Sequence, residues 1–264
     1  MSEQRDARED LGSVGALAGI NWANASAYRR TMQDYDPDTG HDQAWVGTTA
    51  HKLFCDRLDR VFSCGKYSVD SPEAAGEGLD VVAAGLGPGE YKRMPRITPG
   101  LITRADANGS PGWRYGDWRW LLASFTFGES NSIPWPQKSR TKRRVASQPI
   151  PDQLMFPEDD PITMALQAIV QAIAEEEDNA ALTTLIVAHS VERELGIREL
   201  FLGRSRLNKG GGAAWHWKHD LLAATPGTPG SGPIPVVPEP RTGPPGVPDA
   251  AVRLRRQAQE GGSK

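Results

Sequence analysis

Cysteine is scarce in this chain, and its scarcity excludes one class of protein and one kind of metal site. The 264 residues contain two cysteines, Cys55 and Cys64, and no Cys-x-x-Cys pair. This count excludes a disulfide-rich secreted scaffold and a zinc site built on four cysteines. We therefore expect both thiols to be free, as in the reducing cytoplasm.

Long apolar runs are also absent. No stretch approaches the roughly 18 apolar residues that cross a bilayer. The first residues of the chain are charged and lack the apolar core of a secretory signal. These features favour a cytoplasmic protein that makes no contact with a membrane.

Apolar residues make up only 38% of the chain, and they are distributed unevenly. Nine of the 21 prolines lie between residues 226 and 248, and residues 1–40 are polar with no strong periodicity. We expect a flexible segment at 1–40, with a short helix near residues 16–32 as the alternative there, one globular domain at 41–222, and a disordered Pro/Gly-rich tail at 223–264. The domain is long enough to enclose a core.

The centre of the domain predicts β-structure. Residues 97–127 contain the turn pair Asn108-Gly109, which is typical of a tight hairpin. In the following stretch Trp118, Trp120 and Leu122 alternate with Leu121 and other apolar residues, which predicts a strand covered on both faces. A rival interpretation has Asp117 capping a helix with Trp118, Leu121, Leu122 and Phe125 on one face.

Helices are predicted around this sheet. Apolar residues recur at spacings of three, four and seven over residues 42–62, and Ser71-Pro72 predicts a second helix that ends in the glycine-rich stretch 85–89. After a basic and proline-containing linker at 136–160, residues 161–196 predict a helical hairpin that includes His189 as a packed residue. Residues 198–207 fit a short helix or an extended segment. The predicted fold class is therefore α+β, with a small antiparallel sheet packed against several helices.

The charge is asymmetric although the net charge is only −3. Residues 91–144 contain eleven Lys or Arg against three Asp or Glu, whereas residues 152–178 contain eight acidic residues and no basic one. Arginine outnumbers lysine 22 to 8, which suits phosphate recognition by guanidinium groups but also fits the codon bias of a GC-rich genome.

Basic and aromatic residues alternate near the predicted hairpin, which favours single-stranded nucleic acid, because rings stack on bases while cations neutralise phosphates. We hypothesise a nucleic-acid-binding surface that includes Trp113 and Tyr115 together with a larger set of basic and aromatic residues. The candidate nucleic-acid-binding residues there are Arg114, Trp118, Arg119, Trp120, Lys138, Arg140, Lys142, Arg143 and Arg144. The alternative is that the tryptophans belong to the core and that 138–144 is a solvated loop.

A second basic group precedes a glycine run. Arg204, Arg206 and Lys209 lead into three glycines at 210–212, whose backbone amides could approach a phosphate. The alternative is a flexible hinge before the segment 213–220, which would dock elsewhere. The sequence contains neither a Walker loop nor a dinucleotide fingerprint.

One spacing indicates an enzyme. Asp80, followed after nine residues by Glu90-Tyr-Lys92, resembles the signature of the restriction-endonuclease-like (PD-(D/E)xK) nucleases. The resemblance implies two carboxylates that hold Mg²⁺ and a lysine that helps to activate water, with Glu90 and Lys92 on a β-hairpin. Without this Mg²⁺ site, no cofactor is expected.

Three functions remain open at this stage. The leading hypothesis is a non-enzymatic accessory protein that binds DNA or RNA, and the runner-up is the Mg²⁺-dependent nuclease. A third is a protein–protein adaptor that uses residues 158–178 or the C-terminal tail. His51 and Cys55 have a metal-compatible spacing on one helix, but the sequence offers no matching second pair, so we interpret them as ordinary helix residues.

Overall fold

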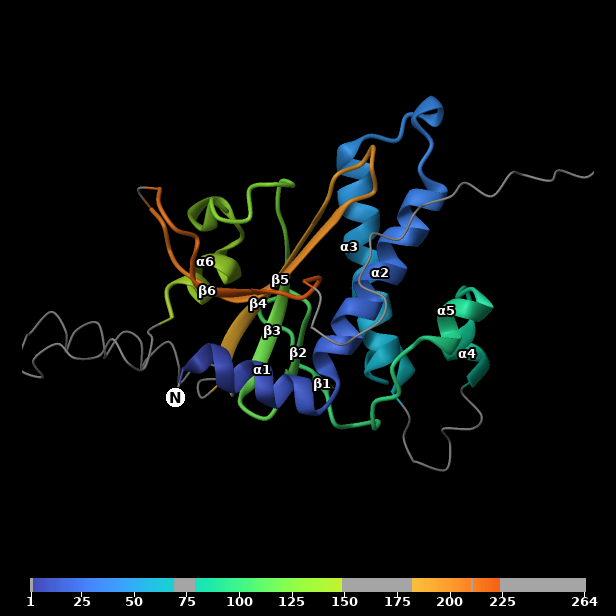
Figure 1. Ribbon diagram of the computed structural model, residues 1–264, viewed down its shortest axis with the longest axis horizontal. Coiled ribbons are helices and arrows are strands. Elements are labelled where there is room, and N and C mark those ends of the chain that lie inside the picture. The colour runs from blue at the N-terminus through green and yellow to red at the C-terminus, as the bar shows by residue number, and fades with distance from the viewer. Residues whose placement is uncertain (1, 69–78, 149–181, 210, 224–264) are drawn as a thin grey trace, which may run out of the picture. The chain divides into compact units, whose positions relative to one another are not determined.

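The computed structural model describes residues 2–68, 79–148, 182–209 and 211–223 (Figure 1). Within these residues, six α-helices and a six-stranded mixed sheet form an α+β fold, which confirms the predicted class. The helix predicted for 161–178 and the whole acidic segment at 152–178 lie outside the described residues, as does the C-terminal tail from residue 224.

The sheet follows the order of the chain. Its strands are β1 (Thr103–Arg104), β2 (Gly112–Tyr115), β3 (Trp118–Ser124), β4 (Thr183–Val191), β5 (Arg198–Ser205) and β6 (Trp215–Asp220). Neighbouring strands are antiparallel except β3 and β4, which run parallel with Trp120 opposite Leu185. Parallel neighbours need a crossover connection, and that connection contains the short 3-10 helix η4 (Trp135–Gln137) and the helix α6 (Arg140–Ala146).

Two tight turns shape the first half of the sheet. Asn108 and Gly109 both have positive φ, at 46° and 76°, between the bridged residues Ala107 and Ser110. This geometry confirms the predicted turn. A second turn at Gly116 (φ 53°) joins β2 to β3, so Trp118 begins a strand and the helical interpretation of this stretch is wrong.

Three helices precede the sheet. They are α1 (Glu3–Ser13), α2 (Ala16–Asp34) and α3 (Gln43–Val61), and α3 begins where the Asp42 carboxylate accepts a hydrogen bond from the Trp45 amide at 2.8 Å. The predicted helix at 42–62 is thus confirmed. The flexible segment predicted for 1–40 is wrong, because its small residues pack closely. At Gly19, for example, an added Cβ would lie 2.8 Å from the Phe62 ring.

The two faces of the sheet carry separate cores. The helices α1, α2 and α3 cover one face, where Trp120, Leu122 and Val187 are buried. On the other face, η4 and α6 cover Leu121, Ile186 and Ala188. Figure 1 shows α6 on one side of the strands, and α2 and α3 on the other. The alternating apolar residues of β3 therefore point into two cores, as the sequence predicts.

The second half of the chain corrects two predictions, and it shows the extended form that was one of the two expected for residues 198–207. Residues 183–191 form β4 where the second helix of a hairpin was expected, and 198–205 form β5. The segment after the glycines is β6 at the edge of the sheet, so it is not a separate docking segment. β-Branched residues in β4 favour a strand, and an apolar run of this length does not distinguish the two by periodicity.

Candidate nucleic-acid interface

The tryptophans predicted to stack on bases are mainly core residues. Trp113 and Trp120 are fully buried; Trp120 packs edge-on against Phe62, and the Trp113 indole donates a hydrogen bond to Asp59 at 3.0 Å. Trp118 is half-buried and donates to Asp10 at 2.8 Å. The predicted stacking surface is therefore wrong, because a sheet with helices on both faces encloses the large rings of β3.

The cations predicted to bind nucleic acid, in both groups, are divided in the same way. Arg119 and Arg204 are buried, with 5% and 3% of their surface exposed. Arg119 donates to the Thr184 hydroxyl at 2.9 Å, and Arg204 lies 4.0 Å from Glu3. Neither side chain reaches the surface where a phosphate would bind. Arg114 and Arg206 are exposed, on β2 and after β5.

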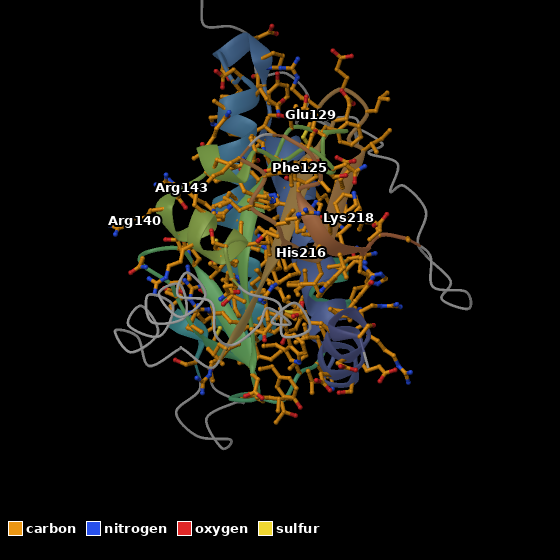
Figure 2. All side chains as sticks on the ribbon, turned by 90° about the vertical axis from the view of Figure 1, so that its left-hand side faces the viewer. Phe125, Glu129, Arg140, Arg143, His216 and Lys218 are labelled. Carbon is orange, nitrogen blue, oxygen red and sulfur yellow. The ribbon has the colours of Figure 1, made fainter. Side chains whose placement is uncertain are left out.

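The basic run at 138–144 was predicted as part of the linker 136–160, but most of it forms the amphipathic helix α6. The Ser139 hydroxyl caps the helix by accepting a hydrogen bond from the Lys142 amide at 3.4 Å. Thr141 and Val145, one turn apart, are buried against the sheet. The exposed face carries Arg140, Arg143 and Arg144. Figure 2 shows Arg140 and Arg143 on the outer side of this helix, away from His216 and Lys218.

A groove runs beside this exposed face, and we call it the α6 groove. It has a volume of about 1070 Å³ and joins three segments distant in sequence: the Asn108 turn, α6 and the loop before β6. Its lining residues are Asn108, Pro136, Ser139, Arg140, Thr141, Arg143, Arg144, Ser147, Leu207 and Lys209. Four are cationic, and no carboxylate lines the groove in the part of the chain that the structure describes.

A smaller cavity of about 350 Å³ lies between α3 and α6, and we call it the α3–α6 pocket. Its lining residues are Gly47, Thr48, His51, Lys52, Leu122, Ala123, Ser124, Lys138, Ser139 and Lys142. Ser139 lines both hollows, so the pocket adjoins the groove. Three lysines and a histidine face this space, and the described lining contains no acid.

Two of the three pocket lysines are partly removed from water. Lys138 donates a hydrogen bond to the Ser124 carbonyl at 2.8 Å, and burial lowers the pKa of this lysine. Burial also lowers the pKa of Lys142, and the positive charge of Lys138 lowers it further. A half-buried lysine that has no carboxylate partner among the described residues is costly, and an anion held beside it would offset this cost.

His51 is the surface end of a buried hydrogen-bonded chain. Its Nδ1 atom lies 3.3 Å from Nε2 of His189 on β4, and Nδ1 of His189 lies 2.8 Å from the hydroxyl of Tyr28 on α2. The two imidazole planes differ by 19° with centroids 5.5 Å apart. Burial, and next the positive charges of the pocket, lower the pKa of His189 to about 3, so this residue is neutral.

The Tyr28 hydroxyl decides which group donates in each hydrogen bond of the series Tyr28–His189–His51. Among the described residues, Nδ1 of His189 is its hydrogen-bond partner, and leaving a buried O–H unpaired costs about 1–3 kcal/mol. Tyr28 therefore donates to His189, and the Nε2–H group of His189 donates to Nδ1 of His51. With Nδ1 accepting, the proton of neutral His51 sits on Nε2, which remains available to the pocket. His51 thus presents a donor, which suits an anion.

The nuclease signature does not assemble as the resemblance requires. Asp80 belongs to the short helix α4 (Leu79–Ala83), and Glu90 and Lys92 belong to the helix α5 (Pro88–Lys92). Glu90 caps its own helix through the Gly87 amide at 3.3 Å and lies 3.7 Å from Arg29. The β-hairpin expected for Glu90 and Lys92 is therefore wrong, because Pro88 begins a helical turn there.

Among the described residues, no group of three or more His, Cys, Asp or Glu side chains is placed to hold a metal ion. None of the helices in the described ranges combines the length and apolar character needed to cross a bilayer. Comparisons of the chain with protein-family models, with curated proteins and with solved structures give no match.

Sequence reasoning missed the α3–α6 pocket. His51 was noticed only for its spacing from Cys55, and His189 was assigned to a helix. The residues that meet here lie 138 and 161 positions apart along the chain, so no local pattern connects them. The one available signal was the cluster of lysines at the start of α6.

Proposed function

We propose that this protein binds nucleic acid through the phosphate backbone, which lies in the α6 groove. One observation supports this proposal above the others: four cations from α6 and from the loop before β6 line a single groove whose described lining has no carboxylate. Arg140 and Arg143 are exposed on the outer side of α6, where their guanidinium groups can contact successive phosphates.

The remaining groove residues suit a backbone more than a base. Ser139, Ser147 and Asn108 offer hydroxyl and amide donors for phosphate oxygens. The described lining contains no aromatic ring on which a base could stack. We therefore propose binding driven by charge, with weak dependence on base sequence, and a non-enzymatic accessory role.

Fluorescence anisotropy with the full chain tests this function. Labelled single-stranded DNA, single-stranded RNA and duplex DNA of equal length are titrated between 50 and 200 mM salt, and affinity should fall steeply with salt, because phosphate contacts release counterions. The double variant Arg140→Gln/Arg143→Gln should weaken binding about tenfold or more at low salt. The matched control is Arg8→Gln/Arg96→Gln, which removes two exposed arginines outside the groove.

Two results would contradict the proposal. One is binding that stays constant over this range of salt. The other is an equal loss of affinity in the control variant, which would mean that any two positive charges serve the same purpose.

A further inference from the structure

We propose that the α3–α6 pocket binds a phosphate monoester, so that the protein recognises the phosphorylated end of a strand whose backbone occupies the α6 groove. This inference rests on the proposed function for its choice of ligand, but the pocket and its donors are independent of the groove. The shared chemistry is a dianionic phosphoryl group, which a strand end or a free mononucleotide can supply.

The charge of the pocket fits a dianion better than a phosphodiester. Lys52, Lys138 and Lys142 surround a space of about 350 Å³, and no carboxylate among the described lining residues offsets them. A backbone diester brings one negative charge, whereas a monoester brings nearly two at neutral pH. Compact ammonium groups also suit a terminal phosphoryl group, which they can approach from several sides.

The neutral donors of the pocket complete the site. The Nε2–H group of His51 is held by the chain through His189 to Tyr28, so its direction is fixed before a ligand arrives. Hydroxyl groups of Thr48, Ser124 and Ser139 line the same space. A terminal phosphoryl group has more free acceptor oxygens than a phosphodiester in the backbone. This set of donors can form hydrogen bonds to several of them.

The position of the pocket connects it to the strand. Ser139 lines both the pocket and the α6 groove, so a strand in the groove can place its end among the lysines without leaving the protein surface. The groove is lined by exposed arginines, and the pocket by lysines of which Lys138 and Lys142 are half-buried. This difference fits a phosphodiester backbone in the α6 groove and a terminal phosphate in the α3–α6 pocket.

The test compares strands that differ only at one end. A single-stranded oligonucleotide labelled at its 3′ end is prepared with a 5′-phosphate or a 5′-hydroxyl, and a second pair carries the label at the 5′ end and varies the 3′ group. Adenosine monophosphate and inorganic phosphate serve as competitors. We expect one phosphorylated end to bind at least fivefold more tightly than its hydroxyl partner.

Variants assign that preference to the pocket. In Lys142→Gln and His51→Phe the preference should fall to about one. Lys52→Gln, at an exposed position, should reduce it without altering the fold. Arg140→Gln/Arg143→Gln should weaken both strands equally and keep the preference. Circular dichroism and thermal melting establish that each variant is folded.

The outcomes separate the two proposals. If salt-dependent binding persists but neither phosphorylated end is preferred and neither competitor displaces the strand, the pocket inference is wrong and the groove proposal stands. If no oligonucleotide binds, but adenosine monophosphate binds and Lys142→Gln abolishes this, the groove proposal is wrong and the pocket takes a free mononucleotide. A preference that survives in Lys142→Gln, Lys52→Gln and His51→Phe alike overturns the inference.

Discussion

The Nε2 atom of His189 lies 3.3 Å from the Nδ1 atom of His51, so a hydrogen bond between two imidazoles joins strand β4 to helix α3. His189 also accepts a hydrogen bond from the Tyr28 hydroxyl, so α2, α3 and β4 meet at one buried ring. This contact packs the core beside Phe54, whose ring meets His189 edge-on, and it sets the donor that His51 offers to the α3–α6 pocket.

Stability should fall as the pH is lowered through the range in which the buried histidine would titrate. The pKa of His189 is about 3 in the fold, against 6.5 as its ordinary value, because burial and the charges of His51 and the pocket lysines disfavour the imidazolium. Between these values the unfolded chain binds a proton that the folded chain does not. The free energy of unfolding should therefore decrease as pH falls from about 6.5, by at most about 1.4 kcal/mol per pH unit.

His189→Gln should remove most of this dependence. Urea denaturation at pH 7.5, 6.5 and 5.5 measures the slope for both proteins, and the difference between the slopes isolates His189 from other groups. The variant lacks the hydrogen bonds of His189, so we expect it to be less stable at every pH. The test depends only on the slope of the unfolding free energy against pH. Parallel curves for the two proteins would show that His189 is not buried as a neutral ring.

Two tryptophans on the same face of β3 should behave differently. Trp120 is fully buried against Phe62, so Trp120→Ala should destabilise the fold by about 3–5 kcal/mol. Trp118 is half-buried, and Trp118→Ala should cost about 1 kcal/mol through lost contacts and its hydrogen bond to Asp10. Chemical denaturation gives both values. Equal losses of unfolding free energy in the two variants would contradict the burial of Trp120 and the partial exposure of Trp118.

Close packing between β5 and β6 makes Gly203 sensitive to any side chain. An added Cβ would lie 2.6 Å from the Trp217 carbonyl oxygen and 2.7 Å from the Trp215 ring. Gly203→Ala should therefore destabilise the fold by about 1–3 kcal/mol. Gly89→Ala in α5 is the matched control, because nothing lies within 4 Å of its new Cβ. That control should be neutral or slightly stabilising.

Both cysteines should react slowly with thiol reagents in the folded protein. Burial raises the pKa of Cys55 to about 11 and, with the nearby Asp59 carboxylate, that of Cys64 to about 12. Because the thiolate is the reactive form, labelling with Ellman's reagent at pH 8 should be at least tenfold slower than in denaturant. Rapid labelling of Cys64 in the folded state would contradict its burial.

The sequence predicts best where local signals agree. The helix expected at 42–62 matches α3, because Asp42 caps a long amphipathic pattern. The Asn108-Gly109 turn is also confirmed, since both residues adopt the positive φ that this pair favours. In β3 the alternation of apolar residues correctly predicts a strand with a core on each side.

Other elements depend on contacts that no local pattern shows. In β4, Leu185 and Val187 point into one core while Ile186 and Ala188 point into the other, so the strand has no polar face that would distinguish it from a buried helix. In α1 and α2 most of the buried residues are small or polar, which gives weak hydrophobic periodicity. Residues 1–40 therefore lack a strong local signal for helices.

The candidate site was predicted only in part. The cations of α6 were identified from their density, but their partners in the pocket come from α3 and from the end of β3. The leading hypothesis placed the tryptophans at the surface and kept the core as the alternative, because interleaved rings and cations look alike in a buried strand and in a binding face. Only the packing of helices on both faces of the sheet distinguishes these cases.

The salt dependence of binding by the Arg140→Gln/Arg143→Gln variant tests the α6 groove most directly. We expect its plot of log Kd against log salt to be shallower than that of the unmodified protein by about 1.5, because each lost phosphate contact removes about 0.7 to 0.9 from the slope. The two lines should converge at high salt. Parallel lines, with the variant and the unmodified protein equally sensitive to salt, would contradict a role for this groove in binding phosphate.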